Sequence, residues 1–263
     1  MKELNMADSA LISEINWVDY RRRVRDECAV VLLPIGSLEQ HGPHSPTGSD
    51  EMLTRLIALA VAERSGSLVA PSISYGCWSQ PRTGGGNHFD GTISISGNTM
   101  TALVGDVLCE FVRKGATRIL VLDTHYENEW FVIEGVERAL RDLRLEGFDD
   151  PKIVKVRYFE LIEDDVMEQV FPDGFPGWPL EHAGVMTTSL HLYLTPDIVD
   201  MEKAPSHGPI RYSPYDIFPF DPIDGTQTGC LNSPQAASSK KGELIFDCVV
   251  TSLVDIIHKE FGN

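Results

Sequence analysis

Two short apolar runs, residues 29–35 and 117–122, each pass directly into a loop that carries histidine and carboxylate side chains. Runs of this length with so few polar residues are typical of strands buried on both faces. Further strand candidates at 67–70 and 152–158 are separated from these by longer segments with helical periodicity. Strands that alternate with helices predict an α/β fold, a three-layer sandwich with a mostly parallel central sheet.

The expected helices have apolar residues three or four positions apart. They cover residues 17–25, 50–64, 99–114, 128–145, 181–194 and 244–261, and a short strand is expected over 92–95. No linker interrupts the pattern, so we predict a single domain over residues 1–263. Residues 204–238 are rich in Pro, Ser, Gly and Asp, and we expect them to form a long ordered excursion that packs on a neighbouring subunit.

Charge and cysteine content argue against several classes of protein. The net charge of −17 would repel phosphate backbones, so we expect no nucleic-acid partner, and it would concentrate divalent cations near the surface. The five cysteines are odd in number and form no C-x-x-C pair, which argues against a disulfide framework or a zinc ribbon. The first eight residues lack a signal-peptide pattern, and no stretch approaches 18 apolar residues. We therefore predict a cytoplasmic protein with no membrane span.

Three segments of the chain place a carboxylate close to a histidine. They contain Glu39, His41 and Asp50, then His125 and Glu127, and finally Glu181 and His182. The first two segments follow strand candidates, and in a parallel sheet such loops open on the same edge, where ligands bind. Mixed His, Asp and Glu ligands suit zinc or manganese, and two ions can share a bridging carboxylate. The sequence thus predicts a metal site at this edge.

Each of these residues also has a purely structural interpretation. Glu39 and His41 would be ordinary loop residues, Asp50 would cap the helix that follows it, and His125 alone is more often a plain loop histidine. Recurrence decides between the interpretations, because two strand ends both deliver an imidazole and a carboxylate. The glycine-rich segment at 83–89 matches neither a P-loop nor a dinucleotide fingerprint. It is either a turn or a loop whose backbone contacts a flat ligand.

Taken together, the motifs resemble the creatininase (creatinine amidohydrolase) family, from about residue 17 to the C-terminal helix. The segments that carry the resemblance are L-E-Q-H-G-P-H at 38–44, G-G-G-N-H-F at 84–89, H-Y-E-N at 125–128 and W-P-L-E-H-A-G at 178–184. The resemblance implies a hydrolase that opens the ring of a small cyclic amide, creatinine plus water giving creatine, by means of a metal-bridged hydroxide.

The resemblance also implies two divalent ions. Glu39, Asp50 and His125 would hold one ion, typically Mn²⁺, and His41, Asp50 and Glu127 the other, typically Zn²⁺, with Asp50 as the bridge. Sites of this kind accept Mg²⁺ or Fe²⁺ as well. A homohexamer, a trimer of dimers, is the implied assembly.

For the substrate, the resemblance implies that His182 carries a proton to the leaving ring nitrogen and that Glu181 either orients His182 or binds the substrate. The residues expected to line the substrate pocket are Thr83, Tyr126, Phe159, Trp178, Pro179 and Glu181.

Four positions depart from the family pattern, and the implied metal ligands are not among them. Phe159 stands where the creatininase branch has tryptophan, Pro179 where it has an acidic residue, Asp123-Thr124 where it has Asn-Gly, and Thr187 where it has glutamate. These departures affect the choice of substrate more than hydrolysis. Another cyclic amide, imide or formamide, opened by the same mechanism, is therefore the alternative to creatinine. A non-catalytic, metal-binding structural subunit is the more distant alternative, and the intact Glu181 and His182 argue against it.

Overall fold

A parallel four-stranded sheet forms the centre of the computed structural model, which describes residues 9–149 and 151–262. Residues 1–8, for which the sequence predicts no signal peptide, lie outside the described part. The strands are β1 (Val31–Ile35), β2 (Leu68–Val69), β3 (Arg118–Asp123) and β4 (Lys152–Arg157), in the order β2-β1-β3-β4. The predicted parallel α/β fold is confirmed.

The strand register brings three chain segments to one edge of the sheet. Ile35 at the end of β1 pairs with Asp123 at the end of β3, and Asp123 pairs with Arg157 at the end of β4. The loops that follow these strands therefore leave the sheet at the same level. This geometry gathers polar side chains from distant parts of the chain.

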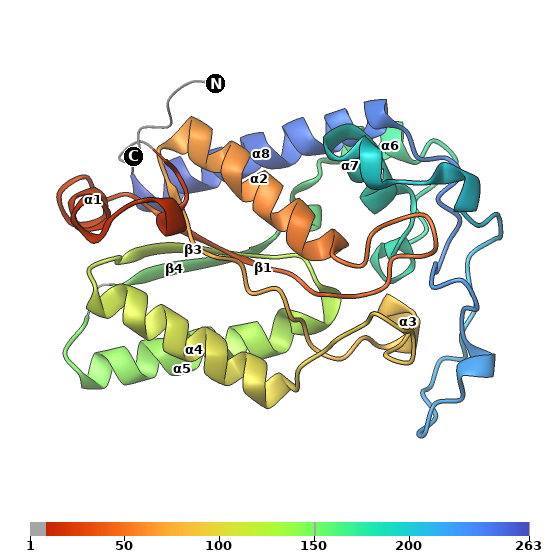
Figure 1. Ribbon diagram of the computed structural model, residues 1–263, viewed down its shortest axis with the longest axis horizontal. Coiled ribbons are helices and arrows are strands. Elements are labelled where there is room, and N and C mark those ends of the chain that lie inside the picture. Colours follow the sequence, from red (N-terminus) through yellow and green to blue (C-terminus); the bar gives the residue numbers. More distant parts are fainter. Residues whose placement is uncertain (1–8, 150, 263) are drawn as a thin grey trace.

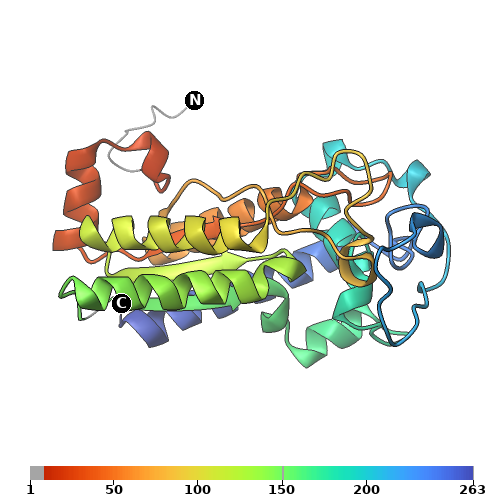
Figure 2. The same ribbon diagram turned by 90° about the horizontal axis from the view of Figure 1, so that it is seen from below.

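Helices cover both faces of the sheet, as expected for three layers (Figure 1). On one face lie α2 (Ser49–Ser65) and α8 (Ser239–Phe261), and on the other α4 (Gly97–Arg113) and α5 (Glu129–Leu145). Figure 2 shows α4 and α5 side by side across the sheet. Each face has its own buried apolar cluster, with Leu53 and Leu253 in one and Met100 and Val132 in the other.

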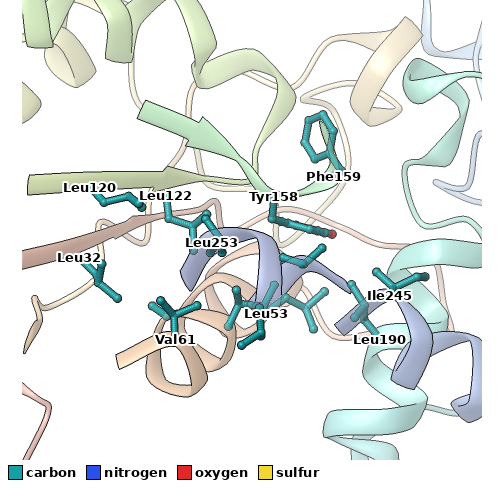
Figure 3. Packing of buried hydrophobic residues seen from close by; sticks show 14 of the residues in the cluster. Leu32, Leu53, Val61, Leu120, Leu122, Tyr158, Phe159, Leu190, Ile245 and Leu253 are labelled. Carbon is teal, nitrogen blue, oxygen red and sulfur yellow. The ribbon is translucent and has the colours of Figure 1, made fainter. Parts of the chain in front are cut away.

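The cluster beneath α2 and α8 extends towards the functional edge of the sheet. Besides Leu53 and Leu253, it includes Tyr158 and Phe159 from the 3-10 helix η5 (Tyr158–Leu161), which directly follows β4 (Figure 3). Burying such aromatic rings removes a large apolar area from water. The aromatic residues at the end of β4 therefore belong to the hydrophobic core.

Two expected elements differ from the structure, whereas a third is confirmed. The helix expected over 17–25 is present as α1 (Trp17–Arg21), continued by a π-helical turn at Arg22–Asp26. The helix expected from residue 181 begins only with α7 (Val185–Leu194), because Ala183 has a positive φ of 54° that interrupts the helix. Residues 92–95 make only isolated bridges, since no neighbouring strand continues beside them. Apolar spacing does not detect such turns.

Two short helices were not predicted, α3 (Pro81–Gly84) and α6 (Asp164–Val170). They are too short to show a helical period.

The excursion at 204–238 contains only the 3-10 turn η9 (Pro222–Asp224) as a regular element and projects from the body (Figure 1). Among the described residues, no helix combines the length and apolar character that crossing a membrane requires.

Candidate metal centre

The first loop of the site brings Glu39 and Asp50 together. The loop after β1 turns back on itself, with the Glu39 N–H donating to the Thr47 carbonyl at 2.8 Å, and then enters α2. Asp50 lies in the first turn of α2, where the helix dipole favours a carboxylate. A Cβ on Gly36 would lie 2.5 Å from the Glu51 nitrogen, so only glycine allows the strand end to approach the helix start so closely.

Glu39 is enclosed on all sides. It is 1% exposed, and its Oε1 has no hydrogen-bond partner in the described part of the chain. A Cβ on Gly84 would come within 2.2 Å of that oxygen, so the glycine-rich loop closes directly over the carboxylate. A buried carboxylate oxygen without a donor is costly unless a cation approaches it.

The two histidines, His41 and His125, face these carboxylates in the orientation that metal ligands adopt. His125 Nε2 donates to the Cys77 carbonyl at 2.9 Å, so Nδ1 faces Glu39 Oε2 at 3.0 Å and Asp50 Oδ2 at 3.3 Å. His41 Nδ1 donates to the Glu39 carbonyl at 3.1 Å, and Nε2 faces Asp50 Oδ1 at 3.4 Å. A backbone carbonyl that fixes the outer nitrogen of a histidine leaves the inner nitrogen free to bind a metal.

The electrostatics of this cluster also suit a cation. Burial opposes ionisation of Asp50 and Glu39, yet the nearby histidines hold the pKa of both carboxyls below their ordinary values. In turn, burial lowers the pKa of His41 and His125, but the carboxylates outweigh it and raise both. The protonated histidines thus neutralise the negative charge of the carboxylates. Divalent metal ions, which are also positively charged, would take the place of the histidine protons.

These donors fit a metal ion. One ligand atom each from Glu39, Asp50 and His125 all lie within 4.8 Å of one another, and all three residues are buried. A second group of the same kind consists of Glu39, His41 and His182. The oxygen and nitrogen donors are of the type that zinc and manganese accept.

Glu127 lies at the margin of this cluster. Its Oε2 is 3.4 Å from His125 Nε2, while its Oε1 accepts hydrogen bonds from the Gln80 N–H at 2.9 Å and from the Thr83 hydroxyl. Burial raises the pKa of Glu127. The structure therefore brings Glu127 next to His125 and Thr83, and it does not group Glu127 with His41 among the described metal-competent sets.

His182 and Glu181 come from the turn before α7. His182 Nδ1 lies 3.9 Å from Glu39 Oε2, and burial lowers the pKa of His182 to about 4. Glu181 Oε2 accepts the Met186 N–H at 2.9 Å, its Oε1 has no partner in the described residues, and burial raises its pKa to about 7. No hydrogen bond between the side chains of Glu181 and His182 is present among the described residues.

The side chains line a small cavity of about 60 Å³ at the sheet edge. We call its metal-competent side the polar floor, which consists of Glu39, His41, Asp50, His125 and Glu127. We call its aromatic lining the aromatic wall, which consists of Tyr126, Tyr158, Phe159 and Trp178. Thr83 and Glu181 also line the cavity, whereas Pro179 lines a wider outer hollow of about 990 Å³.

Packing within the aromatic wall holds its rings. Phe159 contacts Trp178 with 5.1 Å between the ring centroids, and the Arg157 guanidinium lies over both Tyr126 and Phe159, 5.4 Å and 5.1 Å from their centroids. Arg157 is itself held by Glu129, with Nη1 2.6 Å from Oε2. Ring contacts and the paired Arg157 cation therefore both help to position the rings of the wall.

Sequence reasoning missed several residues of the site. Tyr158, Met186, Thr124 and Thr187 line the cavity, although the last two had been noted only as departures from a family pattern. Arg157 packs against two rings of the wall, and Gln40 contacts His182. Only Gln40 had a usable signal, because it lies between two expected ligands in the E-Q-H segment.

Comparisons with known proteins agree with this geometry. The family sequence model described as Creatininase, creatinine amidohydrolase, matches residues 13–257. A creatinine amidohydrolase from Pseudomonas putida is 44% identical over 257 residues, which cover 97% of this chain and 99% of the relative. A solved mutant creatininase complexed with creatine gives a TM-score of 0.94 at 43% identity, over 97% of this chain and 100% of that one.

Creatininase structures in a manganese form and in a mutant zinc–zinc form each give a TM-score of 0.95. Their identities are 43% and 42%, over 97% of this chain and 100% and 99% of theirs. The family match spans nearly all of the described residues and includes all four motif segments. The chain belongs to the creatininase family.

Proposed function

We propose that this protein is a metal-dependent amidohydrolase that opens the ring of creatinine with water to give creatine. The observation that carries the proposal is the polar floor, where buried Glu39, Asp50 and His125 place their ligand atoms within 4.8 Å of one another. The relative from Pseudomonas putida, named creatinine amidohydrolase, supports creatinine as the first substrate.

For the metals, we assign one divalent ion to Glu39, Asp50 and His125, and a second to His41, Asp50 and Glu127. Related creatininases in manganese and zinc forms support Mn²⁺ and Zn²⁺, and the same donors accept Mg²⁺ or Fe²⁺. When bound, such ions supply an activated water and a Lewis acid for the carbonyl group.

Within the protein, His182 moves the proton. Its pKa of about 4 keeps the ring neutral near pH 7, so the histidine first accepts a proton and then gives it up. The proton released by the attacking water thus ends on the ring nitrogen whose bond to the carbonyl carbon breaks. Glu181 binds the substrate through Oε1, which has no partner of its own in the described residues.

The aromatic wall and Thr83 set the shape of the substrate space. Flat rings and a hydroxyl around a cavity of about 60 Å³ suit a small planar molecule. Phe159 offers less stacking area than the tryptophan of the family pattern and no N–H donor. That difference favours a second candidate activity, hydrolysis of another cyclic amide, imide or formamide by the same residues.

An assay of purified, metal-analysed protein tests the proposal. We expect ring opening of creatinine and compare it with hydantoins, lactams and formamides. His182→Ala should abolish most of the activity, and His258→Ala, which changes an exposed histidine on α8, serves as the control. Metal-loaded protein that hydrolyses none of these compounds would contradict the proposal, and activity on another cyclic amide alone would support the second candidate.

We further propose a single creatininase-like domain over residues 1–263, a cytoplasmic location, and assembly into a homohexamer, a trimer of dimers. Exposed apolar side chains on the 204–238 excursion support the assembly, since Phe218 is 80% and Ile223 77% exposed in one chain. Light scattering that gives a stable monomer of 29.2 kDa would contradict it.

A further inference from the structure

Gln40 lies between Glu39 and His41, is 6% exposed, and uses all of its polar atoms. Its side-chain nitrogen donates to the Gly84 carbonyl at 3.0 Å and to the Gly229 carbonyl at 2.9 Å. Its side-chain oxygen accepts the Gly42 N–H at 2.9 Å, and its own backbone N–H donates to the Thr92 hydroxyl at 3.1 Å. One side chain therefore joins three loops that are far apart in the sequence.

The remaining polar atom, the backbone carbonyl of Gln40, meets His182. His182 Nε2 lies 2.8 Å from this oxygen, and because a carbonyl only accepts, Nε2 must carry the hydrogen. The 3.0 Å approach of the Gln40 side-chain nitrogen to Nε2 does not change this, since both amide hydrogens already have carbonyl acceptors. The unprotonated nitrogen is therefore Nδ1, on the side of Glu39.

The glycines around Gln40 show how closely it is packed. A Cβ on Gly229 would lie 1.7 Å from the Gln40 side-chain oxygen, and a Cβ on Gly85 would lie 2.9 Å from the side-chain nitrogen. The same loop holds His182 from its other side, because the Leu231 N–H donates to the His182 carbonyl at 3.3 Å. The end of the 204–238 excursion thus belongs to the surroundings of the catalytic histidine.

We propose that Gln40 is the positioning residue of His182. Its backbone carbonyl selects the Nε2–H tautomer, and its side-chain amide fixes that carbonyl by tying it to the loops at Gly84 and Gly229. Nδ1 of His182 is then the nitrogen that accepts the proton of the attacking water and delivers it to the leaving nitrogen. This inference rests on the proposed function, in which His182 carries the proton.

Kinetics of the metal-loaded enzyme test the role of the side chain. Gln40→Met keeps the length of the side chain and removes both donors, so kcat should fall roughly tenfold, a part of the roughly 10²- to 10⁴-fold that acid–base catalysis typically contributes. KM and metal content should stay within about twofold, because no predicted metal ligand changes. Gln227→Met is the matched control, since Gln227 also donates to two loop carbonyls, those of Pro222 and Gly225, but is exposed.

The tautomer is a readout that does not depend on the substrate. Solid-state ¹⁵N NMR of histidine-labelled, zinc-loaded protein, with His182→Gln to assign the signal, should show a protonated Nε2 and a bare Nδ1. Gln40→Met should give a mixture of tautomers. A native enzyme with the hydrogen on Nδ1 would overturn the proposal, as would unchanged kcat in Gln40→Met or a loss of kcat that only follows loss of metal.

A stability cycle keeps the proposal testable if creatinine is not the substrate. Gly229 and Gly147 both have positive φ, +81° and +87°, but nothing lies within 4 Å of a Cβ at Gly147. Gly229→Ala should therefore lower the unfolding temperature more than Gly147→Ala. In a Gln40→Ala background the two changes should cost the same, and a persisting difference would contradict the close packing of Gln40 against Gly229.

Discussion

The polar floor and the aromatic wall line the same cavity, yet they are held in place by different means. In the floor, hydrogen bonds fix single atoms, as when the Cys77 carbonyl fixes His125 Nε2. In the wall, ring packing holds whole side chains, as when Phe159 contacts Trp178 at 5.1 Å. The floor therefore requires particular residue types, whereas the wall requires only volume and shape. This explains how the wall can depart from the family pattern while the floor does not.

The sharpest test of this difference is Asp50→Ala. If Asp50 bridges two ions, its loss should release both and lower activity by more than about 10²-fold. This loss is larger than the roughly 10- to 100-fold expected when only a hydrogen-bond partner of a metal ligand is removed. Glu127→Ala, at the margin of the floor, should release mainly one ion. Elemental analysis measures the metal content of both purified variants, and Asp255→Ala, which changes an exposed aspartate, is the control. Two ions retained in Asp50→Ala would end the bridging assignment.

Glu181, which lines the same cavity, should make the stability of the fold depend on pH. Burial raises its pKa from 4.5 to about 7, so the folded protein holds this proton more tightly than the unfolded chain does. Ionising this buried carboxyl lowers the free energy of unfolding. The loss is absent below pH 4.5, grows as the pH rises, and is complete above about pH 7. Glu181→Gln should therefore be more stable than the native protein at high pH, by on the order of 3 kcal/mol.

Urea unfolding at several pH values measures this effect, with both proteins equally loaded with metal. The exposed Glu137→Gln provides the control. A Glu181→Gln advantage that does not shrink as the pH falls towards 4.5 would show that the carboxyl is not the cause.

A smaller effect should follow from His182→Ala, which changes proton transfer without touching the proposed ligand sets. Turnover should fall roughly 10²-fold, equivalent to about 2.7 kcal/mol, while both metals and the fold remain. Stopped assays with metal analysis of the same samples check this. Near-native turnover would show that His182 does not carry the proton. Loss of metal would show that His182 is a metal ligand like the residues of the polar floor.

The smallest effect belongs to the wall. Phe159→Trp with Pro179→Asp should restore stacking area and an acidic group, and raise kcat/KM for creatinine roughly tenfold, equivalent to about 1.4 kcal/mol. The gain should lie in KM, because the floor is unchanged. Pro179 lines the outer hollow, whereas Phe159 lines the cavity itself, so Phe159→Trp alone should give most of the gain in kcat/KM. A double change that impairs creatinine turnover would show that these positions do not set specificity.

The floor was far easier to predict from the sequence than the wall. Glu39, Asp50 and His125 follow predicted strands, and parallel strands necessarily end on one edge, so their convergence follows from local pattern alone. Arg157 and Tyr158 carry no such signal, because a cation behind two rings depends on the register of β4 and the path of η5. The turn at Ala183 was missed for the same reason, since a single positive φ leaves no trace in apolar spacing.

Tyr158 and Phe159 belong at once to the pocket and to the buried cluster that includes Leu53 and Leu253. A mutation that enlarges the pocket by trimming one of these rings would cost about 3–5 kcal/mol, against a typical total stability of about 5–15 kcal/mol. New substrates should therefore be reached most easily through exchanges of similar volume, or in a variant that has first been stabilised elsewhere. The shape of the substrate pocket is limited by the packing of the core.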